Sequence, residues 1–200
     1  LPAVKRVTSP VYIIGMGRSG TTILGVLLSM HKDVGFLNEP KALWHAIYPD
    51  EDVIGNYTRG PARYRLSEKD ASPGVARSAR RIFGAYLFAT ASGRLVDKYP
   101  EVVFRVPFIR AIFPDAKFVL LMRNGWDTCA SIELWSKRLG KQKNGEVHDW
   151  WGVDDRKWNI MVQELVRPEP QLRDLLPCLD GPLSHLDRSA IEWIVTTKEG

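Results

Sequence analysis

The sequence predicts an α/β domain in which helices flank a central parallel sheet in three layers. The β-branched run at 11–14 indicates a buried strand, and the apolar segment 21–30, which follows a glycine-rich loop, indicates a helix. The apolar run at 117–122 leads in the same way into a helix that begins near Trp126. Strands that alternate with helices are typical of a parallel sheet that is covered on both faces.

Further strands and helices are expected between these two strand-to-helix units and after the second one. Additional strands are expected at 34–37 and 94–98. Additional helices are expected at 41–47, 75–90, 108–113 and 157–166, with a final one begun by Asp187. The stretch 48–92 is otherwise irregular and rich in Arg, Tyr, Gly and Pro, so we interpret it as an insertion over the sheet.

The composition is that of a globular protein, and the charge favours anionic partners. Hydrophobic residues make up 44% and charged residues 26% of 200 residues, which suits one domain. The net charge of +5 has no basic block, and without a basic aromatic groove no nucleic-acid partner is predicted. No apolar run approaches the ~20 residues of a membrane helix. Cys129 and Cys178 match no metal-ligand spacing, so we expect core thiols and no metal.

The loop GMGRSGTT at 15–22 is almost a phosphate-binding P-loop. The pattern G-x-x-x-x-G-K-[ST] fits, except that Thr21 stands where the lysine should be. In such loops, backbone N–H groups and the following helix N-terminus bind phosphate, while the lysine adds a point charge. Arg18 and the hydroxyls of Ser19, Thr21 and Thr22 remain as donors. The loop therefore predicts a P-loop-like anion site, with a tight strand-to-helix turn as the alternative.

Charged side chains follow the other predicted strands. Glu39 follows the second strand, and Lys98 closes the third. Arg123 follows the last, where an NTPase would carry a magnesium-binding acid. Because ligands of parallel sheets bind beyond the carboxyl ends of the strands, we expect these residues and the loop to converge on one metal-free site.

Two motifs together resemble the sulfotransferases that use 3′-phosphoadenosine 5′-phosphosulfate (PAPS). They are GxxRSGTT after the first strand and R-N-x-x-D-x-x-x-S, from Arg123 to Ser131, after a later one. In that family the first motif binds the 5′-phosphosulfate, and the arginine and serine of the second bind the 3′-phosphate. The resemblance implies that the donor is bound by Gly17, Arg18, Ser19, Gly20, Thr21, Thr22, Arg123 and Ser131. By spacing alone, a surface arginine and a helix-buried serine remain an alternative for the second pair.

Two shorter elements extend the likeness. NEP at 38–40 resembles the family's catalytic glutamate turn, and DKYP at 97–100 is similar to its DK-x-P element, whose lysine lies near the transferring group. The resemblance implies Glu39 as general base, with Arg18 and Lys98 as further catalytic residues. Glu39 could also be only a helix-start carboxylate. If it is the base, partial burial is expected to raise its pKa.

The resemblance implies an enzyme that moves a sulfuryl group from PAPS to an acceptor hydroxyl by in-line transfer and releases 3′-phosphoadenosine 5′-phosphate (PAP). A sulfuryl group carries one negative charge where a phosphoryl group carries two, so arginine and lysine can neutralise the transition state without magnesium. Among sulfotransferases, the sequence resembles the carbohydrate, tyrosyl-protein and bacterial types, and this resemblance favours a carbohydrate acceptor. The alternatives are a nucleotide-binding module without catalysis and a kinase-like protein with a degenerate P-loop.

The resemblance to the sulfotransferase family is strong over residues 11–137 and weaker over the rest of the chain. Residues 1–200 are expected to form a single sulfotransferase domain that lacks its C-terminal part, because family members continue with a segment that helps enclose the donor. The insertion at 48–92 is expected to contribute to the acceptor site, with arginines that meet an anionic acceptor or form a solvated basic face. A cytoplasmic location is favoured over the secretory-pathway lumen, and the oligomeric state is left open.

The seven tryptophans fall into two groups. Three are candidates for stacking on a sugar acceptor, namely Trp44, Trp150 and Trp151. Four others fall in helical patterns and are expected in the core, namely Trp126, Trp135, Trp158 and Trp193.

Overall fold

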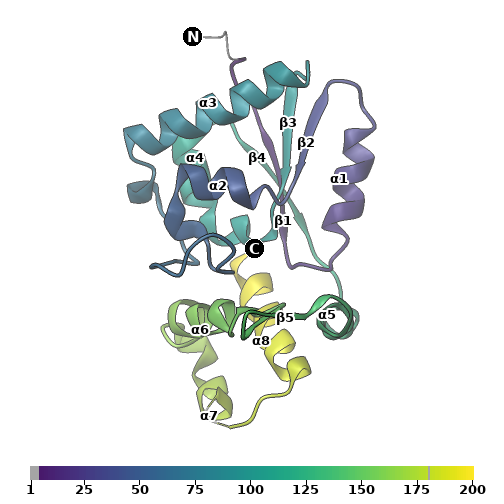
Figure 1. Cartoon of the computed structure of the whole chain (residues 1–200), viewed down its shortest axis with the longest axis vertical. Coiled ribbons are helices and arrows are strands. Elements are labelled where there is room, and N and C mark those ends of the chain that lie inside the picture. The colour runs from purple at the N-terminus through teal and green to yellow at the C-terminus, as the bar shows by residue number, and fades with distance from the viewer. Residues whose placement is uncertain (1–4, 180) are drawn as a thin grey trace.

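The computed structural model describes residues 5–179 and 181–200 and is built around a four-stranded parallel sheet (Figure 1). Its strands are β1 (Val11–Gly15), β2 (Val34–Asn38), β3 (Arg94–Lys98) and β4 (Lys117–Leu121). Their order in the sheet is β2-β3-β1-β4, and all three pairings are parallel. The predicted α/β class is confirmed, and every predicted strand end lies within one residue of the observed end.

Helices cover both faces of this sheet and give the three layers. Helix α1 (Thr21–Ser29) lies on one face, and the other is covered by α2 (Lys41–Ile47), α3 (Pro73–Ala89) and α4 (Val106–Ile112) (Figure 1). Parallel strands cannot be joined by a tight hairpin, so each connection between them runs over a face of the sheet and contains a helix. The connection through α1 joins β1 to β2, which are not neighbours because β3 lies between them. Strand β1 is therefore inside the sheet, between β3 and β4. The loop after β1 therefore opens in the middle of the carboxyl edge.

A polar contact is buried between the sheet and α2. The Asp97 side chain on β3 is fully buried, and its Oδ2 accepts a hydrogen bond of 2.8 Å from Nε1 of Trp44. Burial raises the pKa of Asp97 to about 7, although the hydrogen bond from Trp44 opposes the rise. Trp44 is 3% exposed and packs edge-to-face on Phe83. The expectation that Trp44 stacks on a sugar is therefore wrong, because its indole is part of the core.

Helix α1 differs from the predicted helix that is buried on all sides. Gly25 on its inner side packs closely on the ring of Phe36 in β2. Its outer side exposes the large apolar side chains of Ile23, Val26, Leu27 and Met30. Apolar composition predicts burial, but α1 is the one helix on its face of the sheet in the described part of the chain. These apolar side chains on the outer side of α1 are therefore exposed.

The predicted insertion at 48–92 divides into two parts. Up to residue 72 it is irregular, with the 3₁₀ turns η1 (Pro49–Glu51) and η2 (Glu68–Asp70), whereas α3 belongs to the helical layer over the sheet. The Asp52 carboxylate orders the irregular part by accepting hydrogen bonds from four backbone N–H groups, those of Gly55, Asn56, Tyr57 and Thr58. A buried ion pair of 2.7 Å between Glu51 and Arg105 ties it to η3 (Pro100–Arg105).

Several arginines of this segment have partners inside the chain. Ion pairs of 2.5 to 2.8 Å join Arg59 to Glu146, Arg63 to Asp70 and Arg65 to Glu199. Arg80 donates two hydrogen bonds to the carbonyl oxygen of Ile112. These contacts favour a structural role over recognition of an anionic acceptor.

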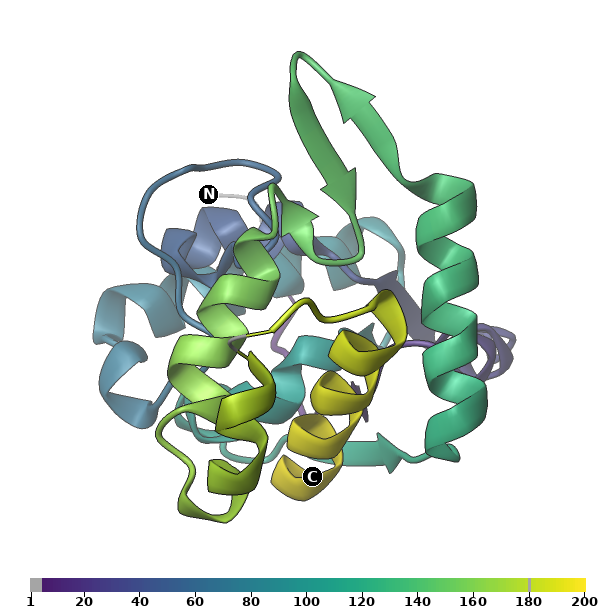
Figure 2. The same cartoon turned by 90° about the horizontal axis from the view of Figure 1, so that it is seen from below.

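The chain beyond β4 forms a helical layer below the carboxyl edge of the sheet (Figures 1 and 2). It contains α5 (Gly125–Leu139), α6 (Arg156–Met161), the π-helix η4 (Val162–Val166), the 3₁₀ helix η5 (Pro170–Leu175), α7 (Leu176–Leu179) and α8 (His185–Glu199). Between α5 and α6, a small antiparallel sheet is formed by β5 (Lys141–Lys143), β6 (Glu146–Asp149) and β7 (Gly152–Val153). A capping box of Ser184 and Asp187 begins α8, so this helix starts earlier than predicted. None of the described helices is both long and apolar enough to cross a membrane.

Burial in this layer corrects three assignments. Trp151 is 1% exposed and belongs to the core rather than to a sugar site, whereas Trp126 is 82% exposed instead of buried. Cys178 is exposed, although Cys129 and Trp158 are buried as predicted. Helical spacing identifies the residues that share a face, but it does not reveal whether another element covers that face.

Replacing Asp97 with Asn should change how stability depends on pH. The pKa of about 7 lies above the ~3.9 of an unfolded aspartate, so the stability that the protonated carboxyl contributes is fully present below about pH 4 and is lost as the pH rises through about 7. Asp97→Asn keeps an acceptor for Trp44 and has no charge to bury. Urea unfolding at several pH values should show the variant gaining stability over the wild type from about pH 4 to about pH 7. A pH-independent difference would contradict the assignment.

Candidate active site

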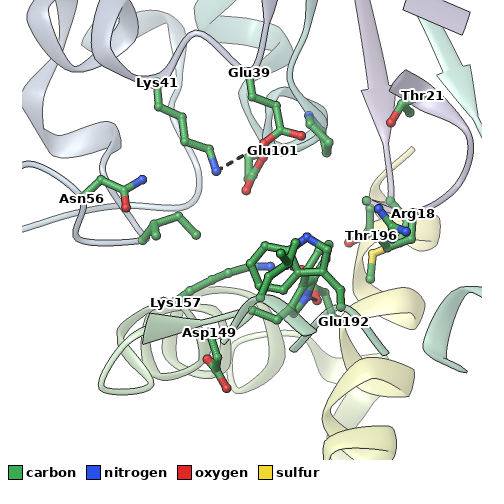
Figure 3. A pocket seen from close by; sticks show the side chains of 18 of the residues that line it. Arg18, Thr21, Glu39, Lys41, Asn56, Glu101, Asp149, Lys157, Glu192 and Thr196 are labelled. Carbon is green, nitrogen blue, oxygen red and sulfur yellow. Dashed lines mark hydrogen bonds and ion pairs between the residues drawn. The ribbon is translucent and has the colours of Figure 1, made fainter. Parts of the chain in front are cut away.

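A pocket of about 420 Å³ lies between the carboxyl edge of the sheet and the helical layer below it (Figure 3). One wall comes from the loop after β1 and from the ends of β2 and β3. The other comes from the β6–β7 turn, α6 and α8. The lining includes six of the predicted site residues, namely Gly17, Arg18, Thr21, Thr22, Glu39 and Lys98.

The loop between β1 and α1 has the features of an anion-binding site. Gly15 and Gly20 have φ values of +121° and +96°, which residues other than glycine rarely adopt. Gly20 is the N-cap of α1 and offers no side-chain cap to the first N–H groups of the helix. Oγ of Ser19 is buried and has no hydrogen-bond partner among the described residues. An anion at this end of α1 would satisfy these donors.

Arg18 links the loop to the second predicted motif. Its Nε donates a hydrogen bond of 3.1 Å to Oγ of Ser131 on α5. Nη1 of Arg123 donates one of 3.2 Å to the carbonyl oxygen of Arg18. Asp127 lies 3.7 Å from Arg123 and acts as its ionic partner. The fold thus brings together two motifs that are far apart in the sequence.

Glu39 and Lys98 form an ion pair at the ends of neighbouring strands. Asn38 at the end of β2 lies opposite Lys98 at the end of β3, and the N–H of Glu39 donates a hydrogen bond of 2.7 Å to the carbonyl oxygen of Lys98. Nζ of Lys98 donates to Oε1 of Glu39, while Nζ of Lys41 lies 3.4 Å from Oε2. The Lys98 side chain is 3% exposed and that of Glu39 is 36% exposed, so the carboxylate is the accessible partner.

The two lysines set the protonation of Glu39. Burial by itself would raise the pKa of Glu39, but the charges and hydrogen bonds of Lys41 and Lys98 outweigh it and hold the pKa below its usual value. The expectation of a raised pKa is therefore wrong for this state of the protein, because it considered burial without the lysines.

The helix-start interpretation of Glu39 has little support from the geometry. Helix α2 begins at Lys41 after Pro40, and its first turn contains no acidic residue. The described hydrogen bonds of the Glu39 carboxylate go to lysine side chains and not to N–H groups of α2. Glu39 also has a φ of +50°, which is uncommon for a residue with a Cβ atom and is often found at functional sites.

The wall formed by α6 and α8 holds a second ion pair. Nζ of Lys157 lies 2.5 Å from Oε1 of Glu192, and both side chains are buried. Figure 3 shows these two residues across the pocket from Lys41 and Glu101. None of these four residues was predicted from the sequence. Lys41 and Glu101 had a local signal, because they directly follow NEP and DKYP, whereas Lys157 and Glu192 come from separate elements without a shared spacing.

In the described part of the chain, no group of three or more His, Cys, Asp or Glu side chains is arranged to hold a metal ion. The groups that face the pocket are instead hydroxyls, backbone donors and lysine–carboxylate pairs. Such a set suits an anionic ligand with a nearby group that can accept a proton.

A model of the sulfotransferase family matches residues 10–173 of this chain. The chain belongs to the sulfotransferase family. The matched span contains the loop after β1, the Glu39–Lys98 pair and the second motif, so every predicted site residue lies inside it.

Two relatives of known name align with much of this chain. The chain is 28% identical over 128 residues to nodulation protein NoeE of Sinorhizobium fredii, an alignment that covers 61% of this chain and 30% of NoeE. It is 26% identical over 192 residues to a protein-tyrosine sulfotransferase of Drosophila melanogaster, with coverage of 86% and 38%. The chain thus spans about a third of the length of these relatives.

A solved structure also aligns with the chain. Sulfotransferase STF9 from Mycobacterium avium is 15% identical, with 94% of this chain and 68% of STF9 covered and a TM-score of 0.42. This score is too low to support an argument about the site.

Proposed function

We propose that this protein transfers a sulfuryl group from PAPS to an acceptor hydroxyl and releases PAP. The observation that carries the proposal is the Glu39–Lys98 pair, which lies in one pocket with a lysine-free phosphate loop. The pocket combines groups for an anionic donor with a carboxylate that can accept a proton. Neither a binding module nor a magnesium-dependent kinase accounts for that combination as directly.

The donor would be held by two sets of residues. The N–H groups at the start of α1, with the hydroxyls of Ser19, Thr21 and Thr22, suit the 5′-phosphosulfate. Arg123 and Ser131 suit the 3′-phosphate. The contacts of Arg18 with both members of this pair support a single continuous donor site.

Three side chains would carry the transfer. PAPS supplies an activated sulfuryl group when it is bound. Glu39 takes the proton from the acceptor hydroxyl as the new O–S bond forms. Lys98 and Arg18 stabilise the negative charge that collects on the bridging oxygen as the old S–O bond breaks, which leaves PAP as the other product.

The Glu39–Lys98 pair also explains how a carboxylate with a lowered pKa serves as a base. Lys98 is held on Glu39 in the structure. A donor anion beside the pair competes for Lys98 and adds negative charge, and both effects raise the pKa of Glu39. The base therefore becomes stronger when the donor is present.

The lining of the pocket favours a carbohydrate acceptor. It includes Trp150, Asn56, Glu101 and Asp149, which combine an aromatic surface with several hydrogen-bond acceptors. Asn56 comes from the irregular part of the insertion at 48–92, in line with a role of that segment at the acceptor site. The kinship with a bacterial nodulation protein is compatible with a cytoplasmic location.

Glu39→Gln should still fold and should bind PAP at least as tightly as the wild type, because the side chain no longer competes for Lys98 as a charge. It should lower turnover by roughly 10²- to 10⁴-fold, because the amide cannot accept the hydroxyl proton. Turnover is measured as transfer of radiolabelled sulfate from PAPS to an acceptor glycoside, with PAP affinity measured by calorimetry. Glu68→Gln, on the exposed turn η2, is the matched control and should match the wild type. Near-normal turnover of Glu39→Gln would exclude Glu39 as the base.

Arg123→Ala and Ser131→Ala should weaken binding of PAP but leave binding of adenosine 5′-phosphate almost unchanged, because only PAP carries the 3′-phosphate. Arg123→Ala should weaken PAP binding more than Ser131→Ala, since hydrogen bonds to charged groups contribute roughly 1.5 to 3 kcal/mol. Calorimetric titrations without magnesium would measure both ligands. Equal losses for the two nucleotides would contradict the assignment, and a requirement for magnesium and ATP would support the kinase-like alternative.

A further inference from the structure

Trp150 is an aromatic residue of the pocket whose ring is held by several contacts. It lies in the turn between β6 and β7, and its Nε1 donates a hydrogen bond of 2.6 Å to Oε2 of Glu192. Nζ of Lys157 lies 4.5 Å from the centroid of its ring, and Trp135 packs against it edge-to-face with 5.4 Å between ring centroids. Contacts in several directions fix the indole in one orientation.

The indole lies directly against the donor loop. A Cβ atom added to Gly17 would come within 2.6 Å of Cη2 of Trp150, so the ring edge touches the loop that is expected to hold the phosphosulfate. The ring is half-buried and lines the pocket. A molecule bound in the pocket next to this loop would therefore lie close to Trp150.

An unpaired carboxylate oxygen lies across the pocket. Oε2 of Glu101 is buried and has no hydrogen-bond partner among the described residues, although Glu101 also lines the pocket. Figure 3 shows Glu101 on the side opposite Lys157 and Glu192, the two residues that hold Trp150. Because a buried polar atom without a partner is costly, this oxygen is suited to receive a hydrogen bond from a ligand.

We propose that the acceptor is a pyranose that stacks its C–H face on Trp150 and donates a second hydroxyl to Glu101, so that the two residues determine which hydroxyl reaches Glu39. The proposal rests on the proposed sulfuryl transfer. A tyrosine ring could also stack on the indole, but its one hydroxyl would be used at Glu39 and would leave Glu101 without a donor. A sugar supplies both the apolar face and the additional hydroxyl.

The test uses the protein saturated with PAP and a panel of methyl pyranosides, with binding followed by saturation-transfer NMR. At least one pyranoside should bind. Trp150→Ala and Glu101→Ala should each weaken this binding by about tenfold or more, whereas Trp150→Phe, which keeps an aromatic face, should stay within about threefold. Trp126→Ala is the matched control, because Trp126 is 82% exposed and does not line the pocket, and it should bind like the wild type.

The outcomes separate this inference from the proposed function. PAP affinity measured for every variant reports whether the donor site is folded, and failure of the wild type to bind PAP would overturn the proposed function itself. If PAP binds but no pyranoside does, or if Trp150→Ala and Trp150→Phe bind pyranosides as well as the wild type, the acceptor proposal is overturned. Transfer of sulfate to a tyrosine-containing peptide and to none of the pyranosides would also overturn it while leaving sulfuryl transfer in place.

Discussion

The ion pair between Glu39 and Lys98 is the contact on which the rest of the site depends. It exists because β2 and β3 are parallel and in register, so the residue after Asn38 lies beside Lys98. A backbone hydrogen bond from Glu39 to Lys98 fixes the same junction. The loop after β1 opens next to it because β1 pairs with β3. Strand order and register thus bring a carboxylate, a lysine and a glycine-rich loop into one pocket.

The pocket keeps its cations by pairing them with carboxylates. Lys98 and Lys41 are matched by Glu39, and Lys157 is matched by Glu192. A buried charge is costly without a partner of opposite sign, so these carboxylates offset the burial of the lysines. In the proposed reaction, an anionic donor that competes for these lysines would raise the pKa of Glu39 and let it act as the base. In this proposal, donor binding and activation of Glu39 are coupled through one contact.

The sequence predicted the elements whose signals are local, and it predicted less of what lies between elements. The four strands follow from hydrophobic period, and the convergence of the loop at 15–22, Glu39 and Lys98 on one pocket follows from the geometry of parallel sheets. Arg123 does not line this pocket and contacts the loop through its hydrogen bond to the carbonyl oxygen of Arg18. Lys157 and Glu192 could not be predicted, because separate elements bring them to the pocket, and the one signal for Glu101 was its place directly after DKYP. The burial of Trp44 and the exposure of Trp126 and of the outer side of α1 were missed for a related reason: apolar character does not specify which partner covers a face.

The most direct test of this account is the pKa of Glu39, measured by NMR titration of protein labelled with ¹³C at the glutamate carboxyl groups. The resonance is assigned by its loss in Glu39→Gln. The account predicts a pKa below the ordinary value of about 4.3 in the free protein and a higher pKa once PAP is bound, because the nucleotide competes for Lys98. A pKa that stays the same when PAP saturates the protein would contradict the coupling between donor and base.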